Sequence, residues 1–501
     1  MHLIGLDIGT TGCKAALFAM DGSLITSAVR EYPVDIPHPG WAEQDAEAVW
    51  RLAQETLRTV IHNSGAQDVQ AIGLSVQGEA VIPVDRDGNA LRPAILGMDT
   101  RTGEQNSWLR QRFGPDYLFQ HTGMPIHTIN TSPKLLWIKQ ATPEVWAQAE
   151  HFLLYEDFLI RKMTGQAAIS RCLASRTQMY DLHADGWSPE ILEALELDPS
   201  RLAPIYPSGT VIGEMQSELA GSLGFSKAPL VVTGGHDQAC GALGVGLTRP
   251  GLSMVSTGTA EVIEVALGIP AVNDTLAQGN ISIYAHVVPG LYLAMTLNHS
   301  GGLILRWFRD NFCQEEKRLA ADSGQDAYDL ILQGSSLEPS PLLLLPHFAG
   351  SGTPHFDTAS KGAILGLTFA STKADLAKAI LEGLTFELRY NLEVLQRGQV
   401  EIQELRAIGG GSRSKLWLQM KADITGIKVV SPRVPEAASW GAALLAGMGA
   451  GCYPSIQGAS EATLQLVQTF TPDPLRKRRY DERYALYKDV YSSVSPVHHR
   501  M

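Results

Sequence analysis

Hydrophobic and polar positions follow the same pattern near the start of the chain and again near its middle. In the first copy, an apolar run at residues 3–8 is followed by a short Gly/Thr turn and a second apolar run at 14–18. In the second copy, the two runs cover residues 254–257 and 262–266. Two apolar runs joined by a tight turn predict a β-hairpin. The repeat therefore predicts two related domains.

The two predicted turns expose backbone N–H groups and threonine hydroxyls, which together favour a phosphate group. When Gly9 is aligned with Gly258, Asp7 falls opposite Ser256, so only the first turn carries a carboxylate. A single carboxylate suits Mg²⁺ beside a triphosphate, because Mg²⁺ keeps most of its waters. We expect a nucleotide between the two domains, and two ordinary polar hairpins are the alternative.

The remaining pattern predicts strands and helices in an order that disfavours a Rossmann opening, because a third strand at 24–32 makes the start a meander. Asp45 begins a predicted helix that reaches residue 62. Residues 100–205 are expected to be a helical insertion that forms one wall of a cleft. The other predicted elements are strands at 69–76, 81–84, 229–233, 281–297 and 404–408, helices from 239 and at 300–313, 372–397, 412–425 and 438–450, and a solvated polar helix and tail at 472–501.

Composition limits the class of protein. The 501 residues exceed what one hydrophobic core usually supports, so we expect two large domains, at residues 1–247 and 248–501. A net charge of −12 argues against nucleic acid or an anionic membrane as a main partner. The five cysteines show no CxxC spacing, and the first residues do not resemble a leader segment. These features predict a cytoplasmic enzyme.

Two further positions suggest chemistry. A glycine run at residues 409–411 lies between a predicted strand and a predicted helix, where a ligand's phosphate or flat face can approach the backbone. Asp237 follows a buried strand and lies between glycine-containing segments. A carboxylate there can orient an acceptor hydroxyl and take its proton. The alternative for Asp237 is a helix cap, and the alternative for the glycines is an ordinary turn.

The ordered motifs resemble the FGGY carbohydrate kinases, which have the actin-like fold. The resemblance runs from Asp7-Ile8-Gly9-Thr10-Thr11 to the segment at residues 436–443, and its most specific part is Gly362-Ala363-Ile364-Leu365-Gly366-Leu367 with residues 375–382. The signature near residues 131–138 is only partly met. The resemblance implies an α/β protein with two duplicated actin-like (ribonuclease H-like) domains and a nucleotide and sugar cleft between them.

The resemblance also implies cofactors and roles for single residues. ATP and Mg²⁺ would be the cofactors, Asp7 would hold the metal, and Asp237 would be the general base. The residues expected to bind ATP are Gly9, Thr10, Thr11 and Lys14 at the first phosphate turn, Gly258 and Thr259 at the second, and Gly410, Gly411, Ser412 and Ser439 around the adenosine.

The acceptor site is expected around Gln77, Gly78, Glu79 and Gln238, with Asp237 beside them. Xylulokinases of the family carry Met-His at the position of Gly78-Glu79, and glycerol kinases carry Arg-Glu there. A carboxylate and an amide suit a vicinal diol. Because Gly78 and Ile129 are smaller than the glycerol-kinase residues, the sequence favours a longer acceptor, a ketose or polyol of four to six carbons.

Three functions fit these features. The leading hypothesis is an ATP-dependent sugar or polyol kinase, whose partner is a small molecule. The alternatives are an actin-like ATPase without a small-molecule acceptor and a glycoside hydrolase that uses two carboxylates. The hydrolase leaves the glycine-rich turns unexplained. Members of the family are often dimers, so a homodimer is one expectation, although no stretch of the sequence marks an interface.

Overall fold

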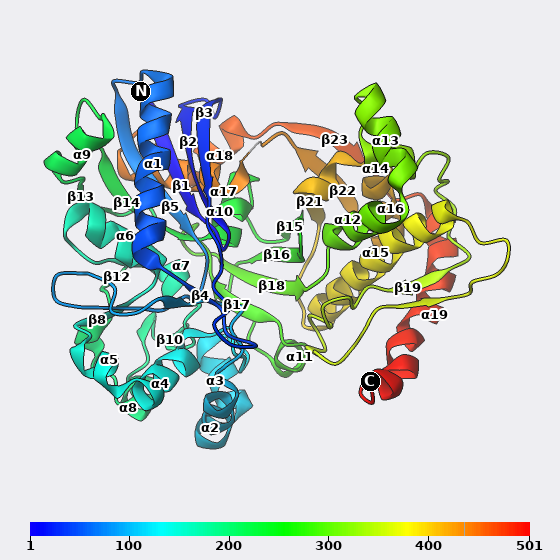
Figure 1. Cartoon of the computed structure of the whole chain (residues 1–501), viewed down its shortest axis with the longest axis horizontal. Coiled ribbons are helices and arrows are strands. Elements are labelled where there is room, and N and C mark those ends of the chain that lie inside the picture. Colours follow the sequence, from blue (N-terminus) through cyan, green and yellow to red (C-terminus); the bar gives the residue numbers. More distant parts are fainter. Residues whose placement is uncertain (435) are drawn as a thin grey trace.

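Two mixed β-sheets form the centres of the two halves of the chain (Figure 1). The structure is a computed structural model and describes residues 1–434 and 436–501. The first sheet has the strand order β13-β14-β5-β1-β2-β3 and the second has β17-β18-β16-β15-β21-β22-β23. All strands of the first sheet lie before residue 237, and all strands of the second lie after residue 251.

The first sheet begins with the predicted meander, which the structure confirms. The antiparallel strands β1 and β2 are joined by the Gly/Thr turn, and β2 pairs with β3. On its other side β1 runs parallel to β5, and β5 runs parallel to β14. Strand β5 is buried along almost its whole length because helices cover both faces. The strands are β1 (His2–Ile8), β2 (Gly12–Ala19), β3 (Leu24–Glu31), β5 (Val69–Val76), β13 (Val211–Glu214) and β14 (Leu230–His236).

Helices cover the first sheet on both faces. On one face, α1 (Ala46–Ser64) begins after Asp45, whose carboxylate accepts hydrogen bonds from two backbone N–H groups, as predicted. This face also carries α6 (Tyr155–Thr164) and α9 (Ser217–Leu223). The opposite face carries α17 (Ala437–Gly449) with α10 (Asp237–Gly244) beside it.

The second sheet contains the second predicted hairpin, which is also confirmed. Strands β15 and β16 are antiparallel, and Thr257 pairs with Glu261 across the turn. The strands are β15 (Leu252–Thr257), β16 (Glu261–Leu267), β17 (Ser282–Ala285), β18 (Tyr292–Asn298), β21 (Glu404–Ile408), β22 (Lys428–Pro432) and β23 (Leu466–Phe470). Around them lie α11 (Asp274–Gln278), α12 (Gly302–Phe312), α13 (Gln314–Ser323), α14 (Ala327–Ile331), α15 (Lys373–Arg397), α16 (Lys415–Thr425) and the small sheet of β19 (Leu343–Leu345) and β20 (Ala363–Leu365).

The predicted insertion is mostly helical and has its own small core. Short strand pairs connect it to the segments around the first sheet; of these strands, the sequence predicted the one at 81–84 and not its partners. Its helices are α2 (Gly103–Phe113), α3 (Pro115–Thr122), α4 (Thr131–Ala141), α5 (Pro143–Gln148), α7 (Arg171–Ala174) and α8 (Pro189–Leu195), and the short strands are β4 (Glu43–Gln44), β6 (Ile82–Val84), β7 (Ala94–Ile95), β8 (His151–Leu153), β9 (Ile169–Ser170), β10 (Tyr180–Asp181), β11 (Gly186–Trp187) and β12 (Ile205–Tyr206).

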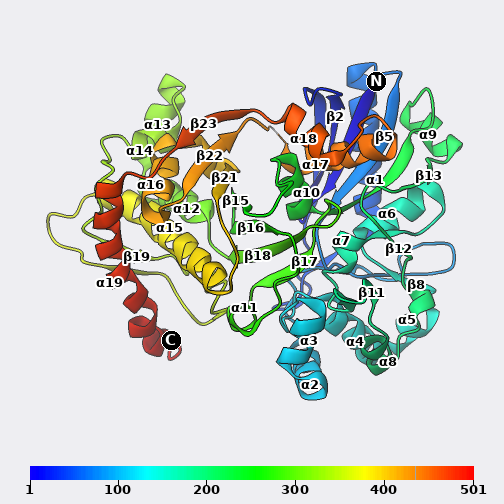
Figure 2. The ribbon, with the colours of Figure 1, turned by 180° about the vertical axis from the view of Figure 1, so that it is seen from behind.

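Helix α17 follows the second sheet's β22 in sequence but packs on the first sheet (Figures 1 and 2). The approach is so close that a Cβ atom on Gly5 of β1 would lie 1.8 Å from the carbonyl oxygen of Ser439. Helix α18 (Ile456–Thr463) stays on the same side, and its Ser460 hydroxyl donates to Leu243 O of α10 at 3.3 Å. A division at residue 247 therefore separates the two sheets but not the helices that cover them.

The C-terminal segment forms the predicted helix, but the prediction that this helix is solvated is wrong. Helix α19 (Pro474–His498) packs on α16 and on the β19 strand, and it buries Tyr480, Tyr484, Tyr487 and Val490 in the core of the second half. Figure 2 shows α19 at the outer edge of the second half, beside α16. Helices α15 and α19 are the longest, at 25 residues each. Within the described part of the chain, no helix has both the length and the apolar character needed to cross a membrane.

Candidate active site

Three carboxylates lie at one edge of the first sheet. Strands β14, β5 and β1 are parallel neighbours, so their carboxyl ends meet at the same edge. Asp7 is near the end of β1, Glu79 follows β5, and Asp237 follows β14. This is the edge where ligands bind in open α/β sheets. The structure thus brings together the predicted metal residue, the predicted base and one predicted acceptor residue.

Asp7 has the environment of a cation ligand. Its Oδ1 accepts a hydrogen bond from the Ser75 hydroxyl at 2.6 Å. Burial raises the pKa of Asp7, although the Ser75 hydrogen bond and the charge of Lys14 act in the opposite direction. A buried carboxylate that is harder to ionise without a positive charge fits an Mg²⁺ site. Lys14 itself pairs with Glu436 at 2.5 Å, just before α17.

The first Gly/Thr turn is held from behind by side chains. Gly9 O accepts from the Tyr32 hydroxyl at 2.8 Å and from Gln77 Nε2 at 3.3 Å. Gln44 Nε2 donates to Thr10 O at 2.8 Å, and the Gln44 side chain accepts from Gln77 at 2.9 Å. These bonds leave the outward side of the turn to a ligand. They also join Gln77 to the phosphate turn, whereas the sequence suggested that Gln77 binds the acceptor.

Asp237 is the first residue of α10, so the predicted helix start near Ala239 lies two residues too late. Its Oδ1 accepts from the Gln238 N–H at 2.6 Å and lies 3.3 Å from His236 Nε2. Burial of the carboxyl group, reinforced by the negative charge of Asp7, raises the pKa of Asp237 to about 7. A carboxylate with this pKa is a stronger base than an ordinary aspartate, which is the property of a general base at neutral pH.

Glu79 is held in an unusual conformation. Its φ of 59° is in the left-handed region, which a non-glycine residue adopts only when its surroundings enforce it. Arg176 Nε donates to Glu79 Oε1 at 2.6 Å, and Lys134 Nζ donates to Glu79 O at 3.0 Å and to Ile129 O at 2.7 Å. Arg176 and Lys134 are both buried, and sequence analysis assigned no role to either. Each is one of many charged residues in the insertion, so no sequence pattern marked either of them.

The expectation that Gly78 opens space for a longer acceptor is wrong. A Cβ atom on Gly78 would lie 2.8 Å from the His236 ring and 3.9 Å from Arg176 Nε. The space is therefore already filled, and Gly78 is small because His236 packs against it. Beyond Arg176, a cavity lined in part by Ile129 and Ser282 has a volume of about 20 Å³. That is room for about one water molecule.

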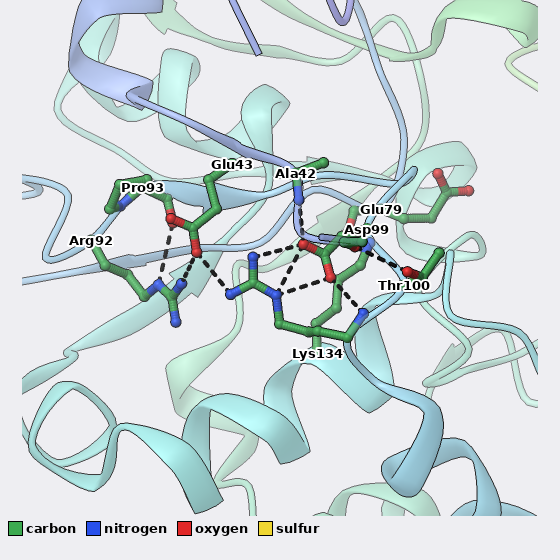
Figure 3. Close-up of polar contacts among 10 residues, drawn as sticks. Ala42, Glu43, Glu79, Arg92, Pro93, Asp99, Thr100 and Lys134 are labelled. Carbon is green, nitrogen blue, oxygen red and sulfur yellow. Dashed lines mark hydrogen bonds and ion pairs between the residues drawn. The ribbon is translucent and has the colours of Figure 1, made fainter. Parts of the chain in front are cut away.

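Next to Glu79, an ion-pair network fixes the segment at residues 41–45 (Figure 3). Asp99 Oδ2 accepts from the Ala42 N–H at 2.6 Å, and Arg101 bridges Asp99 to Glu43. Arg92 pairs with the same Glu43 oxygen at 2.5 Å. In Figure 3 the Glu79 carboxylate points away from this network. The network therefore supports the wall of the site and leaves the Glu79 carboxylate free for other contacts.

The second Gly/Thr turn borders a cavity of about 410 Å³. Cβ atoms added to Gly258 or Gly410 would meet no atom within 4 Å, so these glycines leave open space for a ligand. The described residues that line the cavity include Thr257, Gly258, Thr259, Arg306, Tyr328, Gly410, Gly411, Arg413 and Trp417. Ser412 and Ser439 are not among them: Ser412 bonds back to Gly409 O at 2.8 Å, and Ser439 is buried on α17 against β1.

A buried ion pair lies behind this cavity. Lys421 Nζ of α16 lies 2.5 Å from Glu261 Oε2 and 2.8 Å from the Thr257 hydroxyl, and the Lys421 and Glu261 side chains are each 1% exposed. The Trp417 ring, which lines the cavity, lies 4.9 Å from Lys421 Nζ. The pair thus ties the second phosphate turn to the helix that follows the glycine run.

Comparison with known proteins identifies the family. Residues 2–244 match the N-terminal domain of the FGGY family of carbohydrate kinases, and residues 253–450 match its C-terminal domain. The chain belongs to this family. The xylulose kinase of Escherichia coli (strain K12) is 30% identical over 502 residues, which cover 99% of each chain. The autoinducer-2 kinase of Enterobacter sp. (strain 638) is 30% identical over 506 residues, which cover 98% of this chain and 94% of that one.

Solved structures agree with this assignment. The xyloylose kinase from Brucella ovis has a TM-score of 0.88 and 27% identity, and the match covers 99% of this chain and 100% of that one. The fold is therefore that of the actin-like ATPases, as the sequence predicted. This FGGY kinase uses ATP and Mg²⁺ to phosphorylate a sugar. Its glycine-lined cavity and the half-buried Asp7 fit these two cofactors.

Proposed function

We propose that this kinase phosphorylates a hydroxyl group of a small ketose or polyol, and that Asp237 is the general base. The observation that carries the proposal is the position of Asp237 beside Gln238 and at the same sheet edge as Asp7 and Glu79. Its pKa of about 7 makes it able to take a proton near neutral pH. Since Oδ1 is already bonded to the Gln238 N–H, Oδ2 is the atom that would accept the proton.

The reaction then depends mainly on positioning. Bound ATP supplies the phosphoryl group, and bound Mg²⁺ neutralises its charge. Asp7 would hold the metal, and the Gly9 and Gly258 turns, with Thr10, Thr11 and Thr259, would hold the phosphates. The Asp237 carboxylate orients the acceptor hydroxyl and takes its proton as the oxygen bonds to phosphorus.

Acceptor binding is assigned to Glu79 and Gln238. Arg176 holds Glu79 Oε1, which leaves Oε2 to accept from acceptor hydroxyls, and the Gln238 amide can both donate and accept. The small volume beyond Arg176 limits the acceptor to the Asp237 side of Glu79. Relatives named xylulose kinase support a ketose, while the autoinducer-2 kinase is equally similar and is named for a different acceptor.

The test is Mg-ATP-dependent ADP release across ketopentoses, ketohexoses, tetritols to hexitols, glycerol and sugar acids. We expect one strong acceptor, and we expect Asp237→Asn to lower kcat by about 10²- to 10⁴-fold. Asp87→Asn, on an exposed turn, is the matched control and should retain activity. Near-normal turnover by Asp237→Asn would refute the base. ATP turnover that no acceptor stimulates would favour the actin-like ATPase alternative.

Two further variants separate the metal and acceptor roles. Asp7→Ala should weaken the use of Mg-ATP, and Glu79→Gln should raise the acceptor KM more than the ATP KM. Equal changes in both KM values would make Glu79 a structural residue. We further propose that the kinase acts in the cytoplasm on a small-molecule partner, and the predicted homodimer can be tested by light scattering.

A further inference from the structure

A row of buried polar side chains connects Asp237 to the second half of the protein. His236 Nε2 lies 3.3 Å from Asp237 Oδ1, and His236 Nδ1 lies 3.5 Å from the Tyr284 hydroxyl. That hydroxyl lies 2.8 Å from Glu264 Oε1. His236 ends β14 of the first sheet, whereas Tyr284 is on β17 and Glu264 on β16 of the second. The row therefore crosses from one half of the chain to the other.

The groups in this row are costly to bury, which argues for a function. His236, Tyr284 and Glu264 are all at most 5% exposed, and Glu264 Oε2 has no hydrogen-bond partner among the described residues. Burial raises the pKa of Glu264 to about 8, so this carboxyl group keeps its proton at neutral pH. Burial and the nearby Arg176 charge lower the pKa of His236, so its ring is neutral.

The Tyr284 hydroxyl lies between two buried groups, because it donates to Glu264 Oε1 and faces His236 Nδ1. The His236 ring is thereby held between this hydroxyl and Asp237 Oδ1. We propose that His236 is a positioning residue for Asp237 and that Tyr284, with Glu264 behind it, fixes the His236 ring. The proposal rests on the role of Asp237 as the base.

The geometry explains what this positioning achieves. His236 and the Gln238 N–H both contact Oδ1, so together they turn Oδ2 of Asp237 toward the acceptor. The two contacts of His236 are long, and such contacts shorten in complexes with bound substrates. Because Tyr284 belongs to the second sheet, the base reaches its final orientation only when both halves of the protein are in contact around the substrates.

A matched pair of variants tests the His236 contact. His236→Gln keeps a donor near the position of Nε2, whereas His236→Met has a similar length and no donor. We expect His236→Met to lower kcat about 10- to 100-fold with both KM values within about threefold, and His236→Gln to recover most of the rate. In His236→Met, the acid limb of the pH profile of kcat should move to higher pH. The Asp237 carboxylate loses a donor in this variant, while Asp7, Glu79 and Arg176 still face it.

Tyr284→Phe provides a second test that removes one hydroxyl and little packing. Tyr292→Phe on the neighbouring strand is its control, because the Tyr292 hydroxyl bonds to Arg171 outside the row. We expect kcat to fall several-fold for Tyr284→Phe only, with unchanged melting temperatures. Equal rates for His236→Gln and His236→Met, or equal losses in the two tyrosine variants, would overturn the proposal. Failure of Asp237 as the base would appear separately, as activity in Asp237→Asn.

Discussion

The buried pair of Lys421 and Glu261 gives a quantitative prediction. Replacing Lys421 by Met leaves the Glu261 carboxylate in the core without its positive partner, and both side chains are 1% exposed. Removing one member of a buried ion pair costs about 3–5 kcal/mol, chiefly because the remaining charge has lost its water and its partner. We expect Lys421→Met to lower the free energy of unfolding by that amount.

Lys428→Met is the matched control. Lys428 Nζ lies 2.5 Å from Glu404 Oε2, the same distance that separates Lys421 from Glu261. Lys428 is 47% exposed, however, so water replaces its contact, and the expected loss is less than about 1 kcal/mol. The two variants thus differ in burial and share the substitution and the N–O distance.

Urea unfolding followed by tryptophan fluorescence and circular dichroism measures both losses. The double variant Lys421→Met/Glu261→Gln should be more stable than Lys421→Met alone, because neither charge remains buried. In assays, Lys421→Met should raise the ATP KM and leave the acceptor KM unchanged, since the pair supports the nucleotide cavity. A loss for Lys421→Met within 1 kcal/mol of that for Lys428→Met would refute the argument from burial.

Three further predictions concern packing, pH and the C-terminal helix. Gly234→Ala should destabilise the protein by about 3 kcal/mol or more, because its Cβ would lie 1.5 Å from a β5 carbonyl oxygen. Gly258→Ala, which has open space around the added Cβ, should keep the melting temperature and raise the ATP KM. Since the Asp237 carboxylate must be ionised to accept a proton, activity should fall as the pH drops through about 7, and Asp237→Asn should lack this limb. Deleting residues 474–501 should unfold the second half in calorimetry, whereas deleting 500–501 should not.

Local sequence patterns predicted those elements that local forces determine. Both hairpins and the helix after Asp45 follow from apolar runs, Gly/Thr turns and a capping carboxylate within a few residues. The buried face of α19 could also have been predicted, since Tyr480, Tyr484 and Tyr487 recur at helical spacing on one face. The basic cluster at 476–479, near the start of the same helix, favoured a solvated helix instead.

The interior of the site could not be predicted in this way. Arg176 and Glu79 are 97 residues apart, and Tyr284 and His236 are 48 apart, so no local pattern links them. The prediction that Gly78 opens a pocket failed for the same reason. It compared residue sizes at one position, whereas the volume there belongs to the His236 ring from another strand.

The path of the chain suggests how the two halves move relative to each other. The chain crosses from one half to the other three times: after α10, before α17 and after α18. The last two connecting segments are joined by a hydrogen bond from the Arg433 N–H to Gln465 O at 2.7 Å. Helices α10 and α17 pack closely on the first sheet and on each other, because a Cβ on Gly73 of β5 would lie 2.0 Å from Ala442 O of α17 and one on Gly441 of α17 would lie 1.8 Å from Cys240 O of α10. Any closure must therefore be absorbed by the short links themselves. Since Lys14 pairs with Glu436 directly before α17, the first phosphate turn is connected to the start of that helix.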